Sequence, residues 1–581
     1  LIPYFHRYKV PFLSGIGLLL FARVFEALIP ICLMIAIDSL AQGEPYLMIP
    51  ALGIVGCVIL RFITIFLGRR AIRRVGIATI YDLRKRIFNH TQQQGPKFFA
   101  RFSTGDLMSR AINDVGSIRM LIGFGIRSAS VMFFSAIVGT SFMMYLSPSL
   151  TLWLFVPIPL IAVIAWWLSR QMFPKMILTR EGLADLTSHV QENFNGIRTI
   201  QALAQENAEI GRFNGVNKEY ASRMLSLAYT RSMLNAVMPA LSALCTIVIL
   251  GYGGSKVMSG ELSLGAFAAF FSYLVMLMMP VRMLGMLISM FNMAAAGTQR
   301  VFEVLDYEPE IQDLPTTKTP QKITGHLDIQ ALNFTYPNTD APILKNINLS
   351  IQAGEMIAIT GRIGSGKSTL LKCLVRLVDT PAGHIRIDNH EVRDYPLAQL
   401  RKQVALVLQD PFLFSETLRL NLSYDDVSRE EPLVWNAADA AHLKENILTF
   451  PEQMETLIGE RGVNLSGGQK QRATLARGLI RETPVLLLDD CFASVDTETE
   501  ERILTNLREM REGHTTLMVS HRVSTARHAD RIIVLDEGRI AEIGSHDELL
   551  EKGGLYAALA EAQRSNEQAA ARREALLQEL S

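Results

Sequence analysis

The stretch Gly361-Arg362-Ile363-Gly364-Ser365-Gly366-Lys367-Ser368 decides the fold of the second half of this chain. The short apolar run before it, residues 356–360, predicts a strand, and a helical pattern begins at Thr369. A glycine-rich loop between a strand and a helix is the phosphate-binding unit of α/β nucleoside triphosphatases. Its glycines let backbone N–H groups surround phosphate oxygens, while Lys367 reaches the β- and γ-phosphates and Ser368 binds Mg²⁺. The predicted nucleotide site therefore comprises Gly361, Arg362, Ile363, Gly364, Ser365, Gly366, Lys367, Ser368 and Thr369.

A second buried strand is predicted by the apolar run 485–488, which ends in an acid, Asp489. An all-apolar strand is typical of a parallel sheet that is covered on both faces. Ligands bind such sheets outside the carboxyl ends of the strands, which is where Asp489 lies. We therefore expect Asp489 to hold Mg²⁺ indirectly, together with Ser368.

Upstream of that strand, the segment LSGGQ at residues 465–469 opens another helical pattern. A small polar residue and two glycines at a helix N-terminus form a second phosphate-binding device, here Ser466, Gly467, Gly468 and Gln469. This device cannot hold the phosphate that Lys367 holds. A second copy of the domain, facing this one, would let it close on the partner's nucleotide; a flexible loop is the alternative.

The composition excludes several classes of protein. The 581 residues include 57 Lys and Arg against 56 Asp and Glu, and this balance argues against a nucleic-acid binder. Hydrophobic residues reach 49%, so disorder is excluded as well. The five cysteines form no CxxC pair, so we expect small buried apolar residues rather than a zinc site or a disulfide framework. No secretory signal is predicted, because further long apolar runs follow the first.

The first half of the chain is predicted to cross a membrane six times. A bilayer core of about 30 Å needs roughly 20 apolar residues per helix. The six stretches that fit are about 11–37, 46–68, 128–146, 150–168, 234–255 and 262–281. Arginines crowd the segment 69–127, so the long loops 69–127 and 169–233 and both ends of the chain are expected in the cytoplasm. The predicted location is the inner (plasma) membrane.

Both long loops keep a helical apolar period, so the membrane helices are expected to continue into the cytoplasm. Turns near residues 103–106 and 205–207 are interpreted as short docking helices, with ordinary surface loops as the alternative. Arg23, Glu26 and Arg61 lie inside spans, where charges either pair with each other or line a cavity.

The expected domains are 1–307 in the membrane, a linker at 308–320, a nucleotide-binding domain at 321–565 and a helical tail at 566–581.

Together these features resemble a half-size exporter of the ABC transporter family. The segment LSGGQKQR lies upstream of Asp489, with Ser466 23 residues before that aspartate. The phosphate loop lies further upstream. The resemblance covers essentially the whole chain. It implies a polytopic α-helical membrane domain of six spans with long cytoplasmic helix extensions, followed by an α/β P-loop NTPase domain with a helical subdomain.

The resemblance also implies roles for residues outside the phosphate loop. Tyr336, in FTYP, matches the aromatic residue that stacks on adenine. Gln409 matches the glutamine that touches Mg²⁺ and water, and His521 matches the histidine that contacts the γ-phosphate. Residues 456–462 and 494–496 match two further family segments, the X-loop and the D-loop. The implied cofactors are ATP and Mg²⁺; the implied catalytic residues are Asp490, His521 and Gln409; the implied metal-site residues are Ser368, Gln409 and Asp489.

One position departs from the family pattern. A glutamate usually follows the aspartate of the second strand and polarises the attacking water, but here the residue is Asp490. Its shorter side chain places the carboxylate about 1.5 Å further back, and such a misplacement can cost about 10²-fold in rate. In this feature the chain resembles bacterial heterodimeric multidrug-type exporters, including the MdlA-like chains, in which one half carries this aspartate. The resemblance therefore implies a slow ATP site here and a different partner half that retains the glutamate.

The leading interpretation is one half of an ATP-driven exporter of hydrophobic or amphipathic substrates. A homodimer that exports lipids or peptides, with a working Asp490, is the second. A membrane regulator that binds ATP without pumping is a third. A soluble-type ABC ATPase that acts on DNA or ribosomes is disfavoured by the six predicted spans and the balanced charge.

Overall fold

The computed structural model describes residues 6–43, 47–313, 322–336, 339, 341–459, 462 and 464–565. The chain forms two compact units, Leu1–Gln92 with Phe102–Tyr307, and Gln93–Arg101 with Glu308–Ser581. The predicted helical tail at 566–581 and most of the predicted linker lie outside the described residues.

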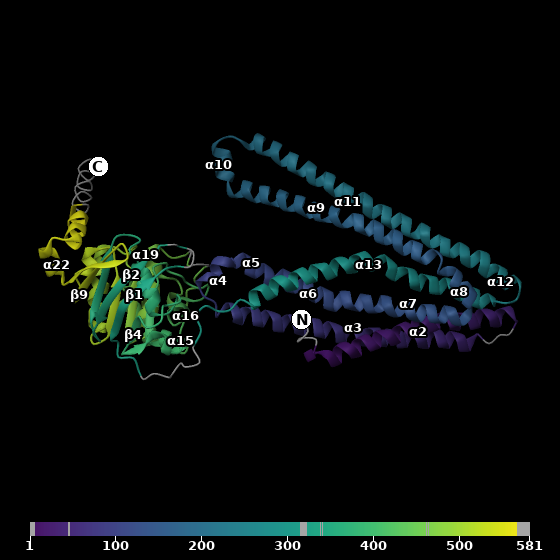
Figure 1. Ribbon diagram of the computed structural model, residues 1–581, viewed down its shortest axis with the longest axis horizontal. Helices are drawn as coiled ribbons and strands as arrows, with labels where there is room; N and C mark the ends of the chain where they lie inside the picture. Colours follow the sequence, from purple (N-terminus) through teal and green to yellow (C-terminus); the bar gives the residue numbers. More distant parts are fainter. Residues whose placement is uncertain are drawn as a thin grey trace. The chain divides into compact units, whose positions relative to one another are not determined.

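Helices are the regular secondary structure of the first unit among its described residues (Figure 1). Its helices are α2 (Lys9–Ala41), α3 (Met48–Thr91), α5 (Thr104–Ser109), η1 (Arg110–Asp114), α6 (Val115–Met120), η2 (Leu121–Ile126), α7 (Arg127–Leu146), α8 (Pro148–Leu154), α9 (Pro157–Asn195), α10 (Ile197–Ala202), α11 (Glu206–Val248), η3 (Ile249–Gly253), α12 (Gly254–Met258) and α13 (Leu264–Leu305). This is the predicted polytopic helical domain.

Within the described residues, three helical stretches are long and apolar enough to cross a membrane, namely Lys9–Ala41, Met48–Thr91 and Thr104–Leu146. They overlap the first three predicted spans. Shorter apolar helices, Ala243–Met258 and Leu264–Met278, overlap the fifth and sixth predicted spans. The full set of six spans remains a prediction.

The helices run far beyond the apolar stretches. Figure 1 shows α9 and α11 as a long pair joined through α10 at one end. Polar contacts as well as apolar packing hold the helices of this unit together. The Tyr273 hydroxyl donates to the Ala27 carbonyl at 2.6 Å, and the Asp38 carboxylate accepts from the Gly265 N–H at 2.8 Å. These two bonds tie α13 to α2.

The helix that docks on the second unit differs from the prediction. Helix α4 (Pro96–Arg101) lies just before the expected turn at 103–106 and belongs to the second unit. Its Phe98 is fully buried, and Lys97 Nζ lies 4.0 Å from Glu310 Oε2. Ser103 instead caps the next helix, α5, by accepting from the Asp106 N–H at 3.3 Å.

The second unit has two sheets. One is antiparallel, in the order β2-β1-β4-β5, with β1 (Leu327–Phe334), β2 (Leu344–Ile351), β4 (Ile385–Ile387) and β5 (His390–Glu391). The other has the order β10-β9-β3-β8-β7-β6, with β3 (Met356–Gly361), β6 (Val404–Val407), β7 (Val485–Asp489), β8 (Thr515–Val519), β9 (Arg531–Asp536) and β10 (Arg539–Gly544). All of its pairings are parallel except that of β10 with β9.

The central strands are buried on both faces, as their apolar runs predict. Every residue of β3 and of β7 is buried. Helices α16 (Leu418–Leu422), α17 (Glu431–Ala440) and α18 (Lys444–Thr449), inserted between β6 and β7, supply the helical subdomain. Their apolar residues share one core with α19 (Gly467–Leu479) and with α20 (Thr497–Met510). This arrangement places the carboxyl ends of β3 and β7 near each other.

Candidate functional site

The phosphate loop follows β3 and needs its glycines. Gly361, Gly364 and Gly366 have positive φ angles of 137°, 83° and 99°. A Cβ atom on Gly361 would lie 1.9 Å from the Leu535 carbonyl oxygen, so only glycine fits there. Gly366 then caps helix α14 (Lys367–Leu374) in the left-handed conformation. The loop is therefore a cradle of backbone N–H groups at a helix N-terminus, which suits an anion.

Lys367 supplies the positive charge of this cradle. Lys367 is 5% exposed, and its Nζ donates to the carbonyl oxygens of Gly361 at 2.9 Å and Arg362 at 2.8 Å. Burial lowers the pKa of the Lys367 ammonium, and the carboxylates of Asp489 and Asp490 oppose that shift. The backbone of Arg362 thus belongs to the cradle, while the Ile363 side chain points away and is 91% exposed.

Ser368 and Asp489 meet at the end of β7, as their spacing predicts. The Ser368 hydroxyl donates to Asp489 Oδ1 at 2.7 Å. Asp489 is almost fully buried, and this burial raises the pKa of its carboxyl, while the hydrogen bond from Ser368 lowers it. A hydroxyl and a buried carboxylate beside a phosphate cradle form the oxygen donor set that Mg²⁺ prefers.

Asp490 turns its side chain toward two other predicted residues. Its φ angle is 46°, and its N–H donates to the Val519 carbonyl at 3.1 Å. Gln409 Nε2 donates to Asp490 Oδ2 at 3.2 Å, and His521 Nε2 lies 4.0 Å from the same oxygen. Burial raises the pKa of the Asp490 carboxyl, and the charge of His521 opposes the shift. The structure thus brings Asp490, Gln409 and His521 together.

Tyr336 lies beside the first turn of α14. Its hydroxyl is 3.4 Å from the Thr369 hydroxyl, and its ring packs edge-on against Phe334 with centroids 5.0 Å apart. The ring is held at the border of the phosphate cradle, where an aromatic face can receive a base.

The LSGGQ segment forms a helix cap instead of joining the phosphate loop. Ser466 accepts from the Gln469 N–H at 3.3 Å, and Gln469 Oε1 accepts from the Ser466 N–H at 2.9 Å. This capping box opens α19. A Cβ atom on Gly467 would lie 3.7 Å from the Ser494 side chain, and one on Gly468 would lie 2.8 Å from the Ser494 carbonyl. The segment therefore packs on the 494–496 loop, and its exposed cap faces outward.

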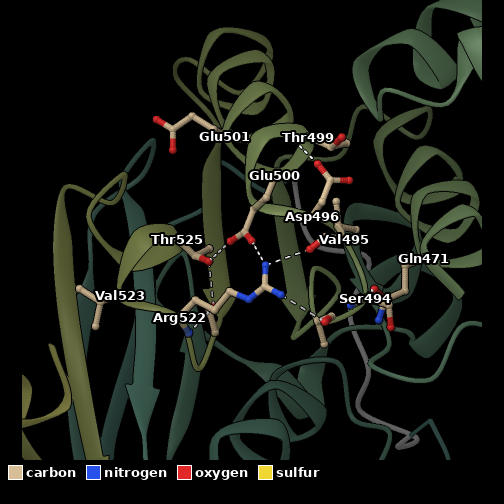
Figure 2. Close-up of polar contacts among 12 residues, drawn as sticks. Gln471, Ser494, Val495, Asp496, Thr499, Glu500, Glu501, Arg522, Val523 and Thr525 are labelled. Atoms are coloured by element: carbon tan, nitrogen blue, oxygen red, sulfur yellow. Dashed lines mark hydrogen bonds and ion pairs between the residues drawn. The ribbon is translucent and has the colours of Figure 1, made fainter. Parts of the chain in front are cut away.

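Sequence reasoning missed the network that holds the 494–496 loop (Figure 2). Arg522, which follows the predicted His521, donates to the Val495 carbonyl at 3.0 Å and the Ala493 carbonyl at 3.3 Å. It also pairs with Glu500, whose other oxygen accepts from the Thr525 hydroxyl. Because Glu500 stands in a highly charged helix, TETEER, no local pattern distinguishes it from its exposed neighbours.

A second missed residue, Gln563, holds the other side of the His521 segment. Its Oε1 accepts from the Val523 N–H at 2.8 Å, and its Nε2 donates to the His521 carbonyl. Gln471 Oε1 accepts from the Ser494 N–H at 2.7 Å. The backbone around His521 is thus linked through Arg522 to the 494–496 loop, and this loop is linked to the helix that Ser466 caps.

We expect Glu500→Ala to lower the free energy of unfolding by about 3 kcal/mol, because it leaves the Arg522 guanidinium without its buried partner. Hydrogen exchange should accelerate at residues 493–496 and 520–523 in the full chain. The matched control is Glu501→Ala, next to it on α20 (Figure 2). Glu501 pairs with Arg527 and His528, but its side chain is 43% exposed, so its loss should cost less than about 1 kcal/mol. Equal stability of the two variants would contradict the structural role of Glu500.

Two family models match the chain. The model of the ABC transporter transmembrane region matches residues 12–281, and the ABC transporter model matches residues 344–493. The chain is 34% identical over 557 residues to an uncharacterised ABC transporter ATP-binding protein, YknU, of Bacillus subtilis strain 168, with 95% of each chain covered.

Two further relatives have names that describe cargo. A protein of Syntrophus aciditrophicus strain SB, named ATP-dependent lipid A-core flippase, is 35% identical over 83% of this chain and 80% of its own. A protein of Bacillus subtilis strain 168, named probable multidrug resistance ABC transporter ATP-binding/permease protein YheI, is 34% identical over 82% and 81%. Among solved structures, a bacterial Atm1-family ABC exporter with ATP bound superposes with a TM-score of 0.79 at 25% identity, covering 96% of this chain and 98% of that one.

Proposed function

The chain belongs to the ABC transporter family as a membrane-spanning, ATP-driven exporter, and from this premise we propose that it is the slow half of a heterodimer. Exporters of this family couple ATP hydrolysis to transport and act as dimers. The proposed assembly is asymmetric, because its other half is a different chain that carries a glutamate at the position of Asp490. The observation that carries the proposal is Asp490 itself, a shorter acid whose carboxylate accepts a hydrogen bond from Gln409.

The proposed roles of the site residues follow from their positions. The phosphate loop and Lys367 would bind and orient the triphosphate of ATP, with Tyr336 against its base. Ser368 and Asp489 would hold Mg²⁺ with Gln409, and the bound cation would neutralise charge on the phosphates. Asp490 would orient the attacking water from further back than a glutamate, so this site would hydrolyse slowly. His521, whose Nε2 lies 4.0 Å from Asp490 Oδ2, would contact the γ-phosphate.

The second ATP site of the assembly would use Ser466 of this chain. Its cap faces outward, packs on Ser494, and presents the positive end of a helix. A facing nucleotide domain would place its own phosphate loop there. In this arrangement each site combines one chain's Lys367-type loop with the other chain's LSGGQ cap.

The α9–α11 pair offers an independent reason to expect a partner. Apolar side chains are exposed on this pair and on the connection between its helices, outside the predicted spans. Phe194 is 72% exposed, Leu203 64% and Ile210 58%. These exposed apolar groups lie on α9, on α11 and in the connection between them, where they are available to an interaction partner. We propose that a second half-transporter covers them.

The proposed setting is the inner (plasma) membrane, with both termini and the nucleotide domain in the cytoplasm and hydrophobic or amphipathic cargo. The arginine-rich segment 69–127 supports that orientation. The cargo names of two relatives, lipid A-core and multidrug, support apolar or amphipathic substrates. A homodimer that exports lipids or peptides is the second candidate, and a working Asp490 would favour it.

The direct test is to purify the tagged chain from its natural membrane and identify what co-purifies. We expect a second half-transporter with glutamate after its Walker B aspartate. The purified pair, reconstituted in liposomes, should move an amphipathic probe only when ATP is supplied. Recovery of a homodimer that transports with full activity would overturn the asymmetric assembly, and absence of ATP-driven transport would leave an ATP-binding membrane regulator.

A further inference from the structure

A cavity inside the first unit has walls of two kinds. It measures about 500 Å³ and lies among α2, α3, η2, α7 and α13. One part of its lining is aliphatic and thioether-bearing, including Leu33, Val131, Met132, Val275 and Met276. The other part carries arginines from three elements, Arg23, Arg61, Arg69 and Arg127. The volume suits a small ligand, and the two kinds of wall suit an amphiphile.

The charges in this cavity do not balance. Its lining holds four arginines and one acid, Glu26. Glu26 pairs with Arg23 and, at 3.0 Å, with Arg61. Neither Arg69 nor Arg127 pairs with a carboxylate among the residues that the structure describes; Arg127 lies over the Phe124 ring at 5.0 Å. The single carboxylate is thus shared by two guanidinium groups, and two more are left over.

The paired arginines also keep unused donors. The Nε atoms of Arg23 and Arg61 are buried and have no hydrogen-bond partner in the described part of the chain. The Arg23 side chain is only 13% exposed. Arg61 lies well inside α3, roughly 20 Å from the helix start at Met48 for a rise of 1.5 Å per residue. Guanidinium groups within a membrane-spanning helix are costly unless they are paired. An anion from outside the chain, held at Arg69 and Arg127, would bring negative charge to this group of four arginines.

We propose that this cavity binds amphiphiles with an anionic, phosphate-type headgroup, the headgroup at Arg69 and Arg127 and the tail along Val131, Met132 and Met276. Guanidinium forks match phosphate oxygens in geometry and charge. Methionine side chains adapt to tails of varied shape. This inference rests on the proposed export function for its purpose, and it narrows the cargo from amphipathic compounds in general to anionic ones.

The test measures equilibrium binding of radiolabelled dodecyl phosphate to the purified transporter in nanodiscs of phosphatidylcholine. Arg127→Gln should weaken binding about tenfold or more, because a hydrogen-bonded ion pair with the headgroup is lost. Arg127→Lys keeps the charge and should retain most of the affinity. The matched control is Arg70→Gln, which removes a neighbouring arginine of α3 that does not line this cavity and should change affinity less than about twofold.

Competitors identify the ligand chemistry. Dodecyltrimethylammonium, with the same tail and the opposite charge, should compete far more weakly than unlabelled dodecyl phosphate. Displacement by phosphatidylglycerol in the nanodiscs would identify a membrane lipid as the source of the headgroup, and its failure would point to a free amphiphile. Equal competition by the cation, or wild-type binding by a correctly folded Arg127→Gln variant, would overturn the proposal.

The two proposals fail separately. If dodecyl phosphate binds as expected but ATP drives no transport, the cavity assignment stands and the export function falls. If ATP drives transport of cationic amphiphiles as well as of anionic ones, and Arg127→Gln transports normally, the export function stands and the headgroup assignment falls.

Discussion

Lys367→Ala is expected to weaken ATP binding at the chain's own site by about a hundredfold or more, since charge-assisted hydrogen bonds to phosphate are lost in a buried setting. Lys367 is 5% exposed and is the cation that the loop Gly361–Gly366 encloses. Equilibrium binding of a fluorescent ATP analogue to the full transporter measures the effect. The partner's site is distinguished by repeating the titration after its own loop lysine has been replaced.

Lys372→Ala is the matched control, because it removes a lysine from the last turn of the same helix, α14. Its affinity should stay within a few-fold of that of the unmodified chain. A melting curve checks that Lys367→Ala remains folded, because Nζ also bonds to the Gly361 and Arg362 carbonyls of its own loop. Unchanged affinity in a folded Lys367→Ala variant would contradict the assignment of the phosphate loop.

The parts of the candidate site that are formed by consecutive residues could be predicted from the sequence. Residues 356–374 form the expected strand, loop and helix, because buried apolar runs, positive-φ glycines and a helix start are local properties. Asp489 meets Ser368 because parallel strands align their carboxyl ends at one edge. These features follow from sequence periodicity and spacing alone.

The rest depends on contacts between distant residues. Gln409 reaches Asp490 across 81 positions, and Arg522 reaches Glu500 across 22, so neither pair leaves a local signal. The expected docking turn near 103–106 missed α4, because the burial of Phe98 depends on what the rest of its unit places around it.

The second large expected effect, on ATPase activity, comes from the different acids that follow the Walker B aspartate in the two proposed halves. Changing the partner's glutamate after Walker B to glutamine should lower ATPase by about 10²-fold or more, because a positioned base contributes that much. Asp490→Asn in this chain should lower ATPase less than about threefold, because the replaced carboxylate already stands further back. The Gln409 amide that donates to Asp490 at 3.2 Å can still bond to the asparagine oxygen, so the loop geometry should persist.

Ser466 provides the second arm of this experiment. Ser466→Ala should lower ATPase about tenfold, since this hydroxyl would contact the nucleotide of the partner's fast site. The change also removes a helix cap, which costs about 1 kcal/mol of stability. Ser545→Ala is the matched control, because Ser545 forms the same capping box with Glu548 at the start of α22 (His546–Lys552). It should lose similar stability and keep its ATPase activity.

The three mutants together decide between the two assemblies. In a heterodimer with one fast site, the partner's glutamine variant and Ser466→Ala are severely impaired, while Asp490→Asn is nearly as active as the unmodified pair. In a homodimer, Asp490 is the only acid available at that position in either site, so Asp490→Asn would abolish turnover. Elimination of ATPase by Asp490→Asn alone would therefore make Asp490 a working base, and the slow site would have to be abandoned together with the different partner that it requires.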